Sequence, residues 1–146
     1  MRNEINENVL ISLKSEYVKK IFSGDKTIEL RRRKMHLEIG TTVWIYETMP
    51  IGAIVGSFSI KNTYSLAPST IWRKYQDVIG VSRKELFSYF DGVEKGFLIE
   101  IENVKELKKP LPLKNLRSLK PAFQPPQFFL KFDVKDKFYS SIFEAI

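Results

Sequence analysis

Three residues with chemically active side chains lie close together near the start of the chain: Lys26, Glu29 and Arg31. An ammonium group can bind a phosphate or carbonyl oxygen, and burial that lowers its pKa makes it a base or nucleophile. A carboxylate beside it can accept the amino proton of a nucleobase or activate water, while a guanidinium holds phosphate bidentately. The spacing therefore predicts either a nucleotide-binding site or a hydrolytic site in which Lys26 and Glu29 are the catalytic residues.

The same residues also have structural explanations, which the sequence leaves open. Lys26 follows Gly24, so one alternative is a surface lysine in a turn. Glu29 and Arg31 are two positions apart, and on one face of a strand they would form a lateral ion pair that orients the guanidinium. This pairing is compatible with ligand binding. We favour Glu29 as the partner that aligns Lys26 and Arg31 over Glu29 as a general base.

Sequence periodicity predicts the elements that position this segment. Tyr17, Val18, Ile21 and Phe22 have helical spacing, and Gly24 ends that helix. Alternation over 27–33 predicts a strand with Glu29 and Arg31 on its polar face and Arg32 on the opposite face. Further strands are expected at 9–13, 41–47, 53–61, 96–102 and 127–133, and further helices at 68–75, 82–90 and 135–146. Gly56 within a strand indicates a bulge or a close backbone approach.

This arrangement predicts an α+β fold. Five or six short strands are interrupted by three or four helices without regular β-α-β alternation. We expect a small, partly closed mixed β-barrel with flanking helices. At 146 residues and 43% hydrophobic content, the chain is expected to be one domain over 1–146, with a core of about 9–132 and a C-terminal helix of about 135–146.

Composition excludes several kinds of site. There is no cysteine, so thiolate catalysis, iron–sulfur clusters, disulfides and cysteine-based zinc sites are ruled out. His36 is the only histidine, so a multi-histidine metal site is excluded too, and we expect His36 in an exposed loop. We expect no cofactor and no metal. The acidic and amide-rich N-terminus predicts no signal peptide, and no later stretch approaches membrane-spanning length, so we expect a cytoplasmic protein without a membrane segment. A monomer is the favoured state.

The net charge of +7 is concentrated in two segments. Residues 11–40 contribute +4 and residues 105–120 contribute +5, while the remainder sums to −2. If the two segments meet in space they form one basic face, for which RNA or DNA is the natural partner. The alternative is solvated lysine that serves solubility. Residues 108–120 carry two prolines, Pro110 and Pro112, and are expected to form a basic loop or short turn.

Two aromatic residues, Trp44 and Tyr46, lie on one face of the strand at 41–47. Stacked on an unpaired base, such a side chain contributes about 1 to 3 kcal/mol to binding. Core packing is the alternative for both. Arg32, Arg33 and Lys34 extend the positive run, and phosphate contacts from them would give affinity without sequence choice.

Taken together, these segments resemble an ASCH domain, a branch of the PUA-like superfamily. The motif Gly24-x-Lys26-x-x-Glu29-x-Arg31 carries the resemblance. Upstream of the motif, Leu10–Lys14 resembles the opening of the family. Downstream, Trp44–Tyr46, Ile54–Gly56 and Gly80–Ser82 recur in the expected order, and Pro125-Pro126-Gln127 resembles the entry to the final strand. The resemblance covers roughly 9–132. It implies a PUA-like β-barrel, a cleft lined by the motif, and involvement with RNA or its modified nucleosides.

The resemblance implies, first, an RNA-binding domain that holds RNA or a nucleotide in a basic cleft. The candidate binding residues are Lys14, Lys26, Glu29, Arg31, Arg32, Arg33 and Tyr46. The alternatives are a ribonuclease, an amidohydrolase acting on acetylated cytidine, and a transcription coregulator or interaction module. The sequence departs from the amidohydrolase pattern, in which a threonine is expected at Glu29 and an acidic residue at Ile79 or Gly80.

Overall fold

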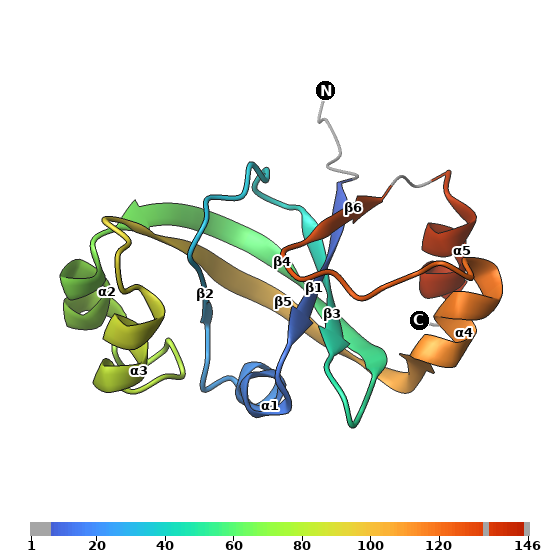
Figure 1. Ribbon diagram of the computed structural model, residues 1–146, viewed down its shortest axis with the longest axis horizontal. Coiled ribbons are helices and arrows are strands. Elements are labelled where there is room, and N and C mark those ends of the chain that lie inside the picture. Colours follow the sequence, from blue (N-terminus) through green and yellow to red (C-terminus); the bar gives the residue numbers. More distant parts are fainter. Residues whose placement is uncertain (1–6, 133–134, 145–146) are drawn as a thin grey trace.

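The computed structural model describes residues 7–132 and 135–144, and in it six strands form one mixed sheet with helices at both ends (Figure 1). The strands are β1 (Asn8–Leu13), β2 (Ile28–Arg31), β3 (Thr42–Glu47), β4 (Ala53–Leu66), β5 (Gly96–Pro112) and β6 (Leu130–Phe132). The helices are α1 (Ser15–Ser23), α2 (Pro68–Tyr75), α3 (Arg83–Tyr89), α4 (Leu113–Leu119) and α5 (Lys137–Glu144). The α+β class is confirmed.

The sheet has the strand order β2-β5-β4-β3-β1-β6. β1 runs parallel to β3, and the other neighbouring strands are antiparallel. The long β4–β5 pair crosses the whole molecule, from α2 and α3 at one end to α4 at the other (Figure 1). This pair is therefore the scaffold on which the shorter strands are placed.

A closed barrel is not confirmed. Among the described residues, no hydrogen-bonded ladder joins the edge strands β2 and β6, which have only four and three residues. The gap is bridged by a side chain instead, because Nη1 of Arg31 on β2 donates to the Phe128 carbonyl just before β6, at 3.4 Å. The sheet is thus open in its backbone pairing, although its two edges approach one another.

Three groups of buried apolar residues fix the helices. Val18 and Ile21 pack α1 onto the central core of the sheet. Ile71 of α2 and Leu86 of α3 belong to a second group that also includes residues of β2 and β5. The third group places α4 and α5 against β1, β3 and β4. The first two groups position the elements that surround the motif.

Local signals predicted several elements well. α2 has the expected bounds, and α3 begins with a capping box in which Ser82 and Glu85 bond reciprocally. Gly56 lies at a register shift of β4, and a Cβ there would clash with the Lys105 carbonyl oxygen and the ring of Phe22. The predicted close backbone approach is confirmed.

The expected basic loop at 108–120 is wrong. β5 continues to Pro112 through pairing with β4, and α4 follows directly. Prolines and lysines are tolerated here because this part of β5 is a sheet edge with irregular pairing, where such residues also discourage association with other strands. β6 is shorter than the predicted 127–133, and residues 133–134 and 145–146 of the predicted C-terminal elements lie outside the described residues.

No helix within the described ranges has the length and apolar character needed to cross a membrane.

Candidate functional site

The chain turns sharply between α1 and β2, and this turn delivers Lys26 to a cavity. Gly24 ends α1 in the left-handed conformation, and the Lys26 amide then bonds the Lys20 carbonyl at 2.9 Å. The Thr27 amide bonds the Val78 carbonyl at 2.9 Å, which ties the turn to the segment before α3. Lys26 therefore points inward because its backbone is held on both sides.

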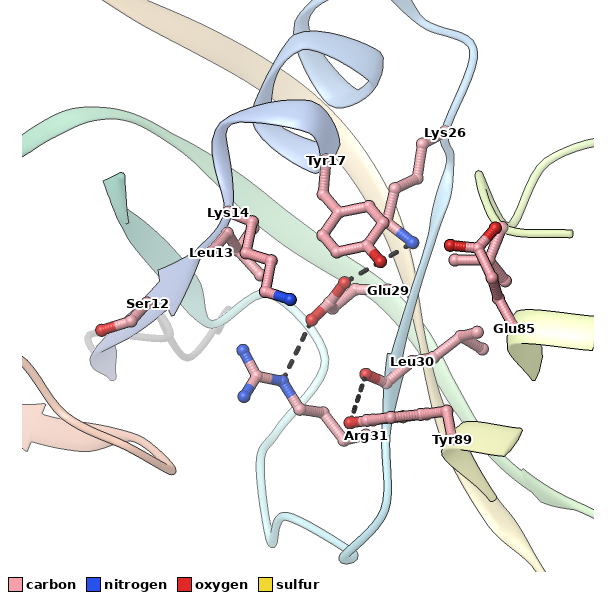
Figure 2. A pocket seen from close by; sticks show the side chains of 11 residues that line it. Ser12, Leu13, Lys14, Tyr17, Lys26, Glu29, Leu30, Arg31, Glu85 and Tyr89 are labelled. Carbon is pink, nitrogen blue, oxygen red and sulfur yellow. Dashed lines mark hydrogen bonds and ion pairs between the residues drawn. The ribbon is translucent and has the colours of Figure 1, made fainter. Parts of the chain in front are cut away.

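A pocket of about 250 Å³ opens between β1, α1, β2 and α3 (Figure 2). It is lined by Ser12, Leu13, Lys14, Tyr17, Lys26, Glu29, Leu30, Arg31, Val81, Glu85 and Tyr89. The three charged residues of the predicted motif all line this one pocket. The lining contributes three cations and two carboxylates.

Lys26 is buried, with 2% of its surface exposed. Its Nζ donates to the Ile79 carbonyl at 2.6 Å and lies 3.6 Å from Oε1 of Glu29. Desolvation lowers the pKa of Lys26, and the Glu29 carboxylate opposes this shift only in part. The ring of Tyr17 adds a cation–π contact, with the ammonium 5.5 Å from the ring centroid.

Gly80 makes room for this lysine. Its φ of +72° favours glycine, and a Cβ at this position would lie 3.0 Å from Cδ of Lys26. Lys20 also donates to the Gly80 carbonyl at 2.8 Å. The Ile79–Gly80 segment therefore holds two lysines through its backbone, a role that side-chain patterns do not reveal.

Glu29 lies between two buried cations. Its Oε2 is 3.0 Å from Nε of Arg31, while its other oxygen faces Lys26. The Nε–H of Arg31 is not directed at the carboxylate, so this is an ion pair without a hydrogen bond, and Nη2 has no partner within the described part of the chain. Both nitrogens are covered from solvent. Arg31 thus keeps one unsatisfied edge beside the pocket.

Two tyrosines form opposite walls of the pocket. Tyr17 comes from α1, and Tyr89 of α3 donates its hydroxyl to the Leu30 carbonyl at 3.3 Å (Figure 2). Burial raises the pKa of both phenols, with a smaller contribution from Glu29, so they stay neutral. Neither tyrosine was predicted as a site residue. The sequence indicates Tyr17 only through its helical spacing, and Tyr89 only as part of the helix expected at 82–90.

The other candidate binding residues lie in different parts of the structure. Lys14 lines the pocket, and its ammonium points toward Glu29 from the α1 side (Figure 2). Arg32 and Arg33 are exposed and do not line the pocket; Arg33 lies over the Phe128 ring, with its Cζ 4.7 Å from the centroid. Tyr46 is buried in the third core group, away from the pocket. The core-packing alternative therefore describes Tyr46, and Trp44 beside it.

The two basic segments do not line a common pocket. Only the first contributes to the pocket lining. α4, which carries part of the second, lies at the opposite end of the molecule from α3 (Figure 1). His36 is exposed. Within residues 7–132 and 135–144, no three metal-ligating side chains gather into a possible ion site.

The protein has an open six-stranded sheet with a pocket beside β2. Comparison with known proteins identifies the family to which it belongs. Residues 7–120 match the family model described as "Domain of unknown function (DUF365)", so the chain belongs to that family. The "ASCH domain-containing ribonuclease" of Zymomonas mobilis is 31% identical over 121 residues, which cover 83% of this chain and 81% of the relative. The chain is therefore a member of the ASCH-domain family.

Solved structures agree with this assignment. The crystal structure of ASCH from Zymomonas mobilis has a TM-score of 0.85 at 28% identity, covering 92% of this chain and 94% of that one. The human THYN1 protein, solved in complex with DNA containing 5-methylcytosine, has a TM-score of 0.62 at 11% identity. That comparison covers 96% of this chain and 98% of THYN1, and it concerns the fold alone.

Proposed function

We propose that this domain binds RNA and takes one unpaired nucleotide into the pocket at Lys26. The observation that carries the proposal is the buried ion cluster at the base of the pocket. Lys26 and Arg31 offer donors, Glu29 offers acceptors, and an edge of Arg31 has no hydrogen-bond partner. A buried polar group without a partner is costly, so a ligand that supplies acceptors stabilises this arrangement.

The walls of the pocket support a nucleobase as the group that enters. Tyr17 and Tyr89 present neutral aromatic rings from α1 and α3. A base has both an aromatic face and a hydrogen-bonding edge, and proteins read single-stranded RNA by stacking the face and bonding the edge. The volume of about 250 Å³ is below the range of roughly 300 to 1,000 Å³ for drug-sized ligands. It suits a single base.

The relative named a ribonuclease supports RNA as the nucleic acid and favours RNA cleavage as a second candidate function. Such a reaction needs a base for the attacking hydroxyl and cations for the charge that develops on phosphate. Lys26, with its pKa lowered, and Glu29 are the candidate bases, and Arg31 is the candidate cation. The proposed binding role requires no cleavage.

We expect purified protein to bind a mixed-sequence single-stranded RNA with an affinity that falls linearly on a logarithmic salt scale, because phosphate contacts release counterions. Fluorescence anisotropy at several salt concentrations measures this. Lys26→Met should weaken binding about tenfold or more, the size expected for a lost charged hydrogen bond.

The matched control is Lys114→Met, which makes the same charge change at an exposed position of α4. It should change the affinity much less than Lys26→Met. Equal losses in the two variants, or binding that does not respond to salt, would contradict binding in the pocket. RNA recovered intact after long incubation would exclude the ribonuclease candidate and leave the binding role standing.

A further inference from the structure

Arg32 is attached to α3, the helix that forms one wall of the pocket. Its Nη1 donates to the Tyr89 carbonyl at 2.6 Å and to the Asp91 carbonyl at 3.1 Å. These carbonyls lie at the C-terminal end of α3, where the last carbonyl groups of a helix lack partners within the helix. The Arg32 guanidinium therefore caps the C-terminal end of α3 and attaches this helix to the residue that follows β2.

A second polar contact joins α3 to β2 itself, with the donor on the helix side. The Tyr89 hydroxyl donates to the Leu30 carbonyl on β2, at 3.3 Å. Tyr89 is thus held at both ends, through its backbone carbonyl by Arg32 and through its hydroxyl by Leu30. Because Glu85 lies one helical turn earlier on α3 and also lines the pocket, the anchoring of α3 places both wall residues.

α3 itself contributes few buried apolar residues, so a polar contact can help to hold it in place. α3 has only seven residues, and Leu86 is its one buried residue. Tyr89 itself is 41% exposed. Leu86 and the flanking Phe90 pack this short helix onto the core, and the two carbonyl contacts of Arg32 add a polar attachment at its C-terminal end. Arg32 is the first residue after β2, and its guanidinium reaches the end of α3, whereas Glu29 and Arg31 line the pocket.

We propose that Arg32 is a positioning residue for the pocket, which sets the α3 wall through the Tyr89 and Asp91 carbonyls and does not itself bind RNA phosphate. This inference rests on the proposed RNA-binding function of the same pocket. It assigns Arg32 a different role from the phosphate contact expected from the run of basic residues. RNA affinity then depends on Arg32 because the wall must be in place before a base can enter.

The salt dependence of RNA binding separates the two roles. For single-stranded RNA, each lost phosphate contact lowers the slope of log affinity against log salt by about 0.7. Arg32→Met should weaken binding about tenfold and leave this slope unchanged. Arg32→Lys should stay weakened, since an ammonium keeps the charge but lacks the planar guanidinium that reaches both carbonyls. The matched control is Arg73→Met on α2, an exposed position with the same charge change, which should bind RNA nearly as wild type.

Hydrogen–deuterium exchange gives a readout that does not need RNA. The amides of α3 should exchange faster in Arg32→Met than in wild type or Arg73→Met, while the amides of α1 keep their protection. A slope reduced by about 0.7, full recovery of affinity in Arg32→Lys, or unchanged exchange in α3 would overturn the positioning role. If wild type binds no RNA, the proposed function fails, and the exchange of α3 still decides whether Arg32 anchors this helix.

Discussion

Glu29→Gln should destabilise the fold by about 3 kcal/mol, since removing one partner of a buried ion pair typically costs about 3 to 5 kcal/mol. Glu29 is 5% exposed and lies within ion-pair distance of two cations that are themselves buried. Glutamine keeps the size of the side chain and removes the charge. The loss of stability therefore measures the cost of leaving Lys26 and Arg31 without a compensating carboxylate. Against a typical domain stability of about 5 to 15 kcal/mol, the effect is large.

Urea unfolding followed by circular dichroism measures this loss. The control is Glu94→Gln, an exposed position before β5 for which the same charge change should alter stability by less than about 0.5 kcal/mol. A Glu29→Gln variant as stable as the control would mean that Glu29 does not compensate Lys26 and Arg31. The ion cluster would then need another explanation.

The free energy of unfolding should rise with pH toward 10.5 because of Lys26. Burial lowers the pKa of Lys26 in the folded protein, whereas the unfolded chain keeps the ordinary value of 10.5. Between these two pKa values the unfolded state binds more protons than the folded state, so raising the pH favours folding. One group can contribute at most about 1.4 kcal/mol for each pH unit.

Lys26→Met removes this contribution and isolates it from other titrating groups. The stability difference between wild type and Lys26→Met, measured by urea unfolding at about pH 8 and about pH 10, should shift in favour of wild type at the higher pH. A difference that stays constant over this interval would mean that the ammonium is not penalised by burial, and that Lys26 is a poor candidate for a base.

Local sequence signals were sufficient for elements whose bounds depend on near neighbours. Pro at the first position of α2 and the Ser82–Glu85 capping box fix helix starts through contacts within one turn. The lengths of β4 and β5 depend on pairing between segments far apart in the chain. Residues 62–66 pair with 96–100, and no period within either segment reports this.

The motif predicted part of the pocket lining. Strand alternation put Glu29 and Arg31 on one face, and both line the pocket. The same alternation put Arg32 on the opposite face, where it contacts α3, so its closeness in sequence to Arg31 was misleading. The rest of the site could not be predicted, because tertiary packing alone brings the Ile79 carbonyl to Lys26 and places Tyr89 in the pocket lining.

The site of RNA contact is tested most directly by photo-cross-linking. A single-stranded RNA that contains 4-thiouridine is irradiated in complex with wild-type protein, and the modified peptides are mapped by mass spectrometry. Binding in the pocket predicts cross-links at Tyr17 of α1 or Tyr89 of α3, the aromatic walls on which a base would stack. Cross-links confined to the basic segment 105–120, with none in α1 or α3, would contradict it.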